Sequence, residues 1–181
     1  MAENPNVFLA HGGSGSAATM VPWADALTDT NPRLRAATVP ATGRLPMKAE
    51  RAVEVFAERT AGSRPVVVGG ISYGGRVASM LAARDPTIAG LVLLSYPLHP
   101  PGKIDQQRVD HLPAIRCPVL FLSGESDPFA RMDLLRAAVT RLESVELYTY
   151  PGVGHALARG PAVMADAVAR VAAFSARALG L

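Results

Sequence analysis

Short apolar runs alternate with longer amphipathic stretches along the chain. Four of the runs are almost continuously apolar, which is typical of strands covered on both faces and predicts positions in the middle of a sheet. The last run alternates apolar and polar side chains, which predicts an edge strand with one face less buried. The predicted strands are residues 6–10, 35–39, 65–70, 90–95, 118–123 and 145–150.

The stretches between these runs place apolar side chains three and four positions apart, which indicates helices with one buried face. The predicted helices are residues 16–30, 47–60, 73–84, 129–142 and 161–179. Because strands and helices alternate, the pattern favours right-handed crossovers and the α/β class: a six-stranded, mainly parallel sheet flanked by helices on both faces, in three αβα layers. The exception is residues 97–117, rich in proline and polar residues, which we expect to form a loop with at most a short helix.

Length and composition narrow the class of protein. A chain of 181 residues with 49% hydrophobic and 18% charged residues is typical of one globular domain, expected here to span residues 1–181. The 18 Lys and Arg residues are scattered and form no basic stripe with aromatics, so nucleic-acid binding is not expected. A single cysteine, Cys117, excludes an internal disulfide, and no run is long enough to span a membrane. The first residues resemble no export signal, so we expect a cytoplasmic protein.

The stretch VVVGGISYGGR, residues 66–76, surrounds one serine with glycines. Gly70 to Gly74 match G-x-S-x-G, the nucleophile elbow, at a strand-to-helix turn. Ser72 must take a strained backbone conformation there, and side chains two positions before or after it would collide with the tight crossing. A glycine-rich turn with an ordinary capping serine has the same pattern, so the motif needs partners to indicate catalysis.

A serine nucleophile needs a base to accept its proton and an acid to orient that base. Asp127 follows the fifth predicted strand in SGESDPF, and His155 follows the sixth in YPGVGHAL. The chain order Ser72, Asp127, His155 is the one used by α/β-hydrolases. Asp127 could instead initiate an Asp-Pro turn, with Glu125 as the acid, and His155 could be a polar loop residue. All three lying at carboxyl ends of strands favours a triad.

An acyl-transfer site also needs two N–H donors for the oxyanion. The sequence predicts the amide of Tyr73 as one donor, because it directly follows the nucleophile. The loop after the first strand begins His11-Gly12-Gly13 and is expected to supply the other, with Gly13 assigned first and Gly12 second. We expect His11 to brace this loop rather than transfer protons.

Together these motifs resemble the small α/β-hydrolases described as dienelactone-hydrolase-like. Within them, YPLHPPGK is most similar to the branch that contains Tex30-like testis-expressed proteins and a subunit of the chromatin NSL complex. The resemblance implies an α/β-hydrolase fold with Ser72, Asp127 and His155 as the triad. Few residues precede the first strand, so a minimal six-stranded sheet is expected. Dienelactone hydrolase uses a cysteine nucleophile, whereas this chain has serine there, so lactone specificity does not carry over.

Rival binding motifs are incomplete. HGGSGSAA has the spacing of a dinucleotide-binding loop, but no acidic residue ends the second predicted strand. Residues 70–77 mimic a phosphate-binding P-loop but carry Arg76 and Val77 in place of its Lys and Ser/Thr. Neither H-E-x-x-H nor paired C-x-x-C occurs, so no metal and no cofactor are expected.

The sequence therefore predicts a serine esterase that cleaves a small ester or thioester through an acyl-enzyme. The alternative is a non-catalytic interaction module, because the resembled branch includes a complex subunit. Without a long insertion after the fourth strand, we expect no substantial lid. The candidate substrate contacts are His99, Trp23, Met20, Phe129 and Leu157, with Arg44 a further polar candidate. Core packing is the alternative for the apolar four, and a solvated surface position is the alternative for His99 and Arg44. The oligomeric state stays open, since an exposed edge strand need not pair.

Overall fold

A computed structural model describes residues 4–40 and 48–181 of the chain. Its centre is one sheet of six parallel strands in the order β2-β1-β3-β4-β5-β6. The strands are β1 Val7–Ala10, β2 Ala36–Val39, β3 Val67–Ile71, β4 Gly90–Leu94, β5 Val119–Gly124 and β6 Val145–Tyr150. The predicted six-stranded sheet is therefore confirmed, and the four most apolar runs do lie between the two edge strands β2 and β6.

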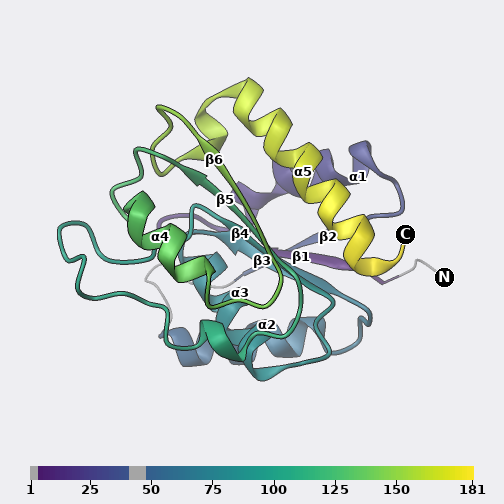
Figure 1. Ribbon diagram of the computed structural model, residues 1–181. Coiled ribbons are helices and arrows are strands. Elements are labelled where there is room, and N and C mark those ends of the chain that lie inside the picture. Colours follow the sequence, from purple (N-terminus) through teal and green to yellow (C-terminus); the bar gives the residue numbers. More distant parts are fainter. Residues whose placement is uncertain (1–3, 41–47) are drawn as a thin grey trace.

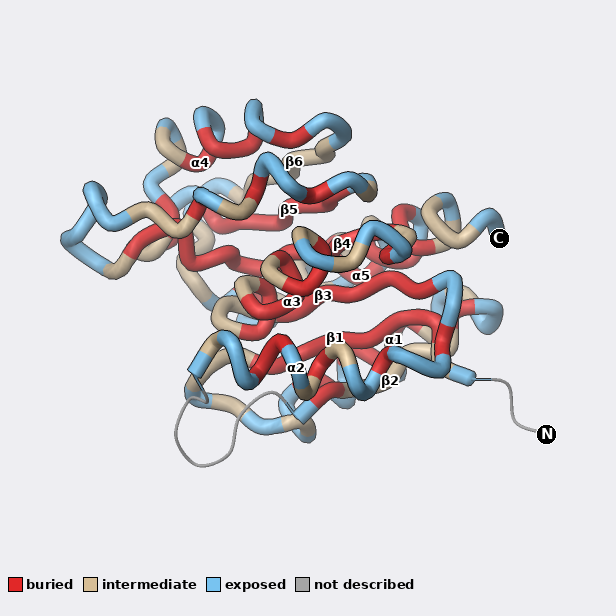
Figure 2. Tube along the Cα trace, turned by 90° about the horizontal axis from the view of Figure 1, so that it is seen from below, coloured by how far each residue is buried: buried red, intermediate tan, exposed pale blue. Residues whose placement is uncertain are grey.

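Helices cover both faces of the sheet, as Figures 1 and 2 show. The α-helices are α1 Val21–Thr30, α2 Ala49–Thr60, α3 Tyr73–Arg84, α4 Met132–Val139 and α5 Pro161–Leu179. Three short 3-10 segments are η1 Ala17–Met20, η2 Leu112–Ala114 and η3 Leu157–Arg159. Apolar side chains of α2, α3 and α4 pack on one face, and those of α1 and α5 pack on the other, which gives the three predicted layers.

The two faces of each central strand explain its apolar sequence. Along β3 and the residue before it, Val66 and Val68 pack toward α2 and α3, whereas Val67 packs toward α1 and α5. Because successive side chains point to opposite faces and both faces are covered, every position must be apolar. At the edge, all six residues of β6 are half-buried, so its alternating sequence does not produce an alternating pattern of burial.

Two helices differ from their predicted bounds for local reasons. The predicted helix 16–30 begins as the 3-10 turn η1 and becomes α-helical at Val21, where Pro22 occupies the first turn. The predicted helix 129–142 is shortened to Met132–Val139. Its first residues are held in a turn instead, because the amide of Phe129 donates to Asp127 Oδ1 at 2.8 Å.

The two ends of the described chain lie together at the amino ends of the strands, on the right of Figure 1. Asn4, Pro5, Leu179 and Leu181 line one surface depression there. The carboxyl ends of the parallel strands therefore face away from the termini, and the loops that follow β1, β3, β5 and β6 share that rim. None of the helices in residues 4–40 and 48–181 is long and apolar enough to span a bilayer.

Candidate active site

Ser72 occupies the sharp turn between β3 and α3. Its backbone dihedrals are φ 50° and ψ −117°, a left-handed conformation that is strained for a residue with a side chain. Two hydrogen bonds hold the turn: Ser72 N donates to Leu94 O at 2.8 Å, and Arg76 N donates to Ser72 O at 3.0 Å. The strain is thus fixed between a central strand and the first turn of a helix, and it lifts the hydroxyl toward the rim.

The glycines on either side of Ser72 allow β1, β3 and α3 to approach closely. A Cβ on Gly70 would meet the carbonyl oxygen of Ala10 and also lie 2.7 Å from the backbone of Gly74. A Cβ on Gly74 would meet the same Ala10 carbonyl. Both obstacles are backbone atoms of packed elements, which cannot move aside, so this crossing requires glycine at both positions.

The three predicted triad residues lie in one chain of hydrogen bonds. Ser72 Oγ is 2.8 Å from His155 Nε2, and His155 Nδ1 is 2.8 Å from Asp127 Oδ2. With Nδ1–H donating to the carboxylate, Nε2 is left as the acceptor for the serine proton. The Asp127 side chain is 0% exposed and that of His155 is 27% exposed, so the carboxylate is sheltered while the imidazole reaches the surface.

The loops that carry Asp127 and His155 are joined by their backbones. Glu125 N donates to Tyr150 O at 3.0 Å, and Ser126 N donates to Val153 O at 2.9 Å. Gly124 lies so close to this second loop that a Cβ there would meet the carbonyl oxygens of Val153 and Gly154. These backbone contacts hold the loop that carries Asp127 beside the loop that carries His155.

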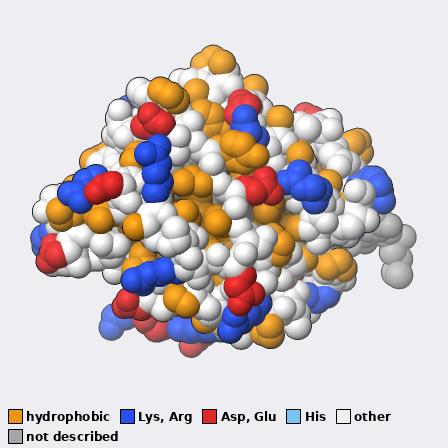
Figure 3. Space-filling model, viewed as in Figure 1, with side chains coloured by type: hydrophobic (Ala, Val, Ile, Leu, Met, Phe, Trp, Pro, Cys, Tyr) orange, Lys and Arg blue, Asp and Glu red, His pale blue; other side chains and the backbone are white. Residues whose placement is uncertain are grey.

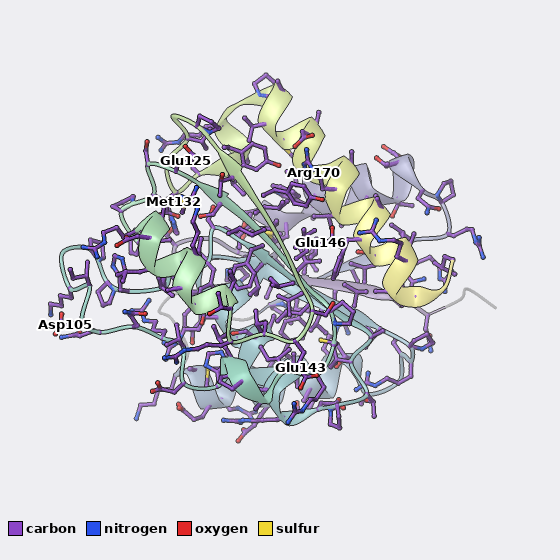
Figure 4. All side chains as sticks on the ribbon, in the orientation of Figure 1. Asp105, Glu125, Met132, Glu143, Glu146 and Arg170 are labelled. Atoms are coloured by element: carbon purple, nitrogen blue, oxygen red, sulfur yellow. The ribbon has the colours of Figure 1, made fainter. Side chains whose placement is uncertain are left out.

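The structure brings Asp127, and not Glu125, to the histidine. Asp127 Oδ2 contacts His155, while Asp127 Oδ1 accepts the amide of Phe129, so both carboxylate oxygens are engaged. Glu125 is exposed, and its Oε1 accepts a hydrogen bond of 2.7 Å from Thr149 Oγ1. Figure 4 labels Glu125 at the end of the sheet where β5 stops.

The predicted oxyanion donors lie on two sides of Ser72. Tyr73 is the first residue of α3, so its amide belongs to the N-terminal end of the helix, directly after Ser72. Gly12 lies against Ser72, since a Cβ there would be 3.6 Å from Ser72 Cβ. His11 is completely buried and its Nδ1 is 2.7 Å from Gly12 O, a contact that braces this loop. Gly13, the residue assigned first, follows in the same turn.

Phe129 and His99 have different contacts around the loop after β5 that carries Asp127, called the acid loop below. The Phe129 ring lies beside the imidazole of His155, with ring centroids 4.4 Å apart. His99 is buried beneath the loop, where its Nε2 accepts the Arg131 amide at 3.1 Å and its Nδ1 is 2.9 Å from Pro100 O. The backbone of His99 also donates to Phe129 O at 3.0 Å. His99 therefore holds the loop of Asp127 in place, a role that its loop position in the sequence did not indicate.

The remaining predicted substrate contacts lie elsewhere. Met20, Trp23 and Leu157 are between 1% and 3% exposed and pack in the core beneath α1 and α5, which is the alternative that the sequence left open. Arg44 lies outside the described residues. Among the predicted contacts that the structure describes, Phe129 is thus the one placed against the imidazole.

The segment after β4 leaves the rim without a helical lid. Between Leu94 and Val119 its described structure contains only the short turn η2. Asp105 marks the tip of this segment, far to the left in Figure 4 and away from the sheet. A cavity of about 320 Å³ separates the segment from the acid loop and is lined by His99, Ile104, Asp127 and Met132, among others.

Metal-ligating side chains and the single cysteine are the other reactive groups to place in the fold. Within the described part of the chain, no group of three or more His, Cys, Asp and Glu side chains is arranged to hold a metal. Burial raises the pKa of Cys117 to about 11, so this thiol stays protonated at neutral pH and is a poor nucleophile. The face drawn in Figure 3 intermixes Lys and Arg with Asp and Glu side chains and gathers neither sign of charge into a broad patch.

Solved structures share this fold at low sequence identity. A monoacylglycerol lipase from Paleococcus ferrophilus superposes with a TM-score of 0.78 at 14% identity, covering 95% of this chain and 94% of that one. Est1E from Butyrivibrio proteoclasticus, solved with ferulic acid, gives 0.73 at 16% identity over 97% and 90% of the chains. A thermophilic esterase from Thermogutta terrifontis gives 0.70 at 17% identity over 97% and 91%. The shared architecture is the α/β-hydrolase fold.

The sequence itself matches a known family. Residues 33–174, most of the chain, match the family described as "Alpha/beta hydrolase domain". This match includes Ser72, Asp127 and His155 and excludes the loop after β1. The narrower likeness to dienelactone hydrolase and the Tex30-like branch stays a prediction. With fold and sequence in agreement, the chain belongs to the alpha/beta hydrolase family.

Proposed function

We propose that this protein is a serine hydrolase that cleaves a small ester or thioester through an acyl-enzyme, with Ser72 as nucleophile, His155 as base and Asp127 as its orienting acid. The observation that carries the proposal is the unbroken hydrogen-bond chain Ser72–His155–Asp127, with two links of 2.8 Å. Such a chain joins a nucleophile, a base and a fixed carboxylate in the arrangement that acyl transfer needs.

In the first half-reaction, Ser72 Oγ attacks the carbonyl carbon of the ester while its proton passes to His155 Nε2. The carbonyl π electrons move to oxygen, and the amides of Tyr73 and of Gly12 or Gly13 stabilise the resulting oxyanion. The imidazolium is stabilised by Asp127, which stays ionised. Collapse of the intermediate breaks the ester C–O bond, and Nε2–H protonates the departing alcohol.

The second half-reaction reverses these roles with water. His155 Nε2 takes a proton from water, whose oxygen attacks the acyl carbon and again forms an oxyanion. Collapse breaks the bond to Ser72 Oγ, which recovers its proton from the imidazolium, and the carboxylic acid leaves. Because the His155 side chain is 27% exposed, the site admits the water that this step consumes.

The substrate class follows from the open rim. No helical lid lies between Leu94 and Val119, so a small or projecting ester suits the site better than a lipid enclosed in a tunnel. The ring of Phe129 beside the imidazole offers an apolar surface for the acyl or alcohol group. Two of the similar structures, a monoacylglycerol lipase and a thermophilic esterase, agree with chemistry at ester bonds.

The test combines covalent labelling with turnover. The intact protein should react with a fluorophosphonate probe and hydrolyse short p-nitrophenyl esters, and Ser72→Ala should lose both. Ser79→Ala is the matched control, because it removes a serine hydroxyl from the helix that follows Ser72 and leaves Ser72 in place. Hydrolysis that survives Ser72→Ala would remove Ser72 from its role. A folded protein that neither labels nor turns over esters would favour the non-catalytic interaction module.

A further inference from the structure

A groove of about 400 Å³ lies on α3, against the segment that ends in η2. Arg76 and Arg84 line it from the helix, and Arg108, Asp110 and His111 line it from the segment. None of its lining residues belongs to the Ser72, Asp127 and His155 chain or to the loops that carry Asp127 and His155. The groove is therefore separate from the proposed catalytic rim, although α3 borders both.

The charges along the groove are unbalanced. Arg76, Arg84 and Arg108 take part in none of the ion pairs that the structure forms between described residues. Asp110 is the one acidic side chain among the described residues that line the groove. The pKa of His111 is lowered to about 4, first by burial and then by Arg76, so at neutral pH it adds no charge. Three guanidinium groups against one carboxylate leave two positive charges in excess.

One donor in the groove is buried without a partner. Arg76 Nε is inaccessible to solvent and has no hydrogen-bond partner in the described structure. Buried N–H donors are almost always paired, and an unpaired one is costly, so the Arg76 guanidinium is not fully satisfied by the protein itself. Burial and the neighbouring Arg76 charge also lower the pKa of Arg108, which means that these cations are held together against their repulsion.

The walls of the groove are fixed before any ligand arrives. Ser79 Oγ, on α3, is 2.7 Å from His111 Nε2 and so holds the segment against the helix. Tyr96 Oη donates to Arg108 O at 2.7 Å, and Arg108 N donates to Leu98 O at 2.8 Å. Since the backbone that carries Arg108 is already ordered, binding would lose less conformational entropy than on a free loop.

We propose that this groove binds a phosphate dianion, either free or as a small monoester, through the guanidinium groups of Arg76, Arg84 and Arg108. The excess of two positive charges matches the charge of a phosphate monoester near neutral pH. Planar guanidinium groups donate paired N–H bonds that fit phosphate oxygens. The volume leaves room for an organic group beside the phosphate, as expected of small-molecule sites.

Titration calorimetry and phosphorus NMR of the intact protein with inorganic phosphate and with phenyl phosphate test the proposal. Saturable binding is expected below about 20 mM, and Arg84→Gln should weaken it about tenfold or more because one charge-assisted contact is lost. Arg76→Lys keeps the charge but removes Nε and the paired donors, so it should weaken binding similarly. Tighter binding of phenyl phosphate assigns the monoester, and equal binding assigns free phosphate.

Arg33→Gln is the matched control, because it removes one arginine charge outside the groove. It should leave the affinity unchanged, and circular dichroism should show that every variant is folded. No saturation with either probe would overturn the proposal, as would an equal loss of affinity in Arg33→Gln and Arg84→Gln, which would mean attraction to net charge alone. If Arg76→Lys does not fold, the exposed Arg84 still decides the outcome.

Discussion

Two serine–histidine hydrogen bonds of nearly equal length involve α3. One is made by the residue just before the helix, and the other by a residue inside it. Ser72 Oγ is 2.8 Å from His155 Nε2, and Ser79 Oγ is 2.7 Å from His111 Nε2. Their surroundings differ. Ser72 precedes the helix in a strained turn, whereas Ser79 is completely buried inside the helix. The Ser79 hydroxyl donates its one proton to Arg76 O at 2.7 Å, so its oxygen accepts from His111 Nε2.

The two histidines differ in the charged groups around their rings. His155 has the carboxylate of Asp127 at its second nitrogen, which stabilises an imidazolium. His111 is buried and lies near the positive charges of Arg76 and Arg84. Burial first, and then these charges, lower its pKa to about 4 against the opposing effect of Asp110. A base with such a pKa accepts a proton poorly at neutral pH. We infer that the third group and the degree of burial, rather than the serine–histidine distance, distinguish the proposed catalytic pair from the buried pair.

The largest expected effect comes from removing the imidazole of His155, the proposed base. His155→Ala should lower kcat for p-nitrophenyl esters by about 10⁵-fold or more, because Ser72 then has no proton acceptor. Steady-state kinetics of the purified variant, with active-site labelling as a check on contamination, measures it. A fall of less than about tenfold would show that another group, such as a different histidine, serves as base.

The next largest effect is expected at Asp127, whose carboxylate contacts His155 Nδ1. Asp127→Asn should lower kcat by about 10⁴-fold, because an amide favours the wrong imidazole tautomer and cannot stabilise the cation. Glu125→Gln, two residues earlier, is the control and should leave activity nearly unchanged, since its carboxylate contacts Thr149. If the two variants exchanged behaviour in the same kinetic assay, Glu125 would be the acid.

A smaller effect, on stability alone, is expected at the second pair. Ser79→Ala leaves the buried nitrogen of His111 without its partner and should reduce the free energy of unfolding by about 1 to 3 kcal/mol. Its kcat/KM should change by less than about threefold, under 1 kcal/mol of barrier. Urea denaturation and ester kinetics on one preparation test both parts. A loss of activity in a stable variant would give this pair a functional role.

The smallest effect is a pH dependence that originates at His111. Its pKa is about 4 in the fold against 6.5 for the free group, so only the unfolded chain takes up this proton between those values. Stability should therefore fall as the pH drops from 6.5 toward 4, by about 1 kcal/mol after solvent screening, and this part should be missing in His111→Gln. Urea midpoints of both proteins at pH 7 and pH 5 provide the measurement; parallel curves would contradict it.

Local rules account for much of what the sequence predicted. The near-continuous apolar runs around Val68 and Leu93 place their strands in the middle of the sheet, because both faces of those strands are covered. Gly70 and Gly74 predicted a tight strand-to-helix crossing, and the structure adds that the carbonyl of Ala10 leaves no room for a side chain at either position. The candidate triad followed from chain order and strand ends, and its geometry agrees with the proposed roles.

The rest depends on contacts that no local pattern encodes. Ser79 and His111 are 32 positions apart and belong to no motif, so their pairing appears only once the segment packs on α3. The sequence predicts a loop position for His99. In the structure the side chain is buried under the acid loop, where it accepts a hydrogen bond from the Arg131 amide. The shortened α4 likewise follows from the side chain of Asp127 competing for the amide of Phe129.

The joined loops after β5 and β6 bear on how this scaffold can be redesigned. Since backbone bonds from Glu125 and Ser126 tie the two loops together, residues grafted into either would shift the acid relative to the base. The stretch Pro101 to Gln106 is exposed at every position and shares no residue with that connection. Engineers who wish to add a cap and select bulkier or more apolar esters should lengthen the chain there, where the catalytic distances stay as they are.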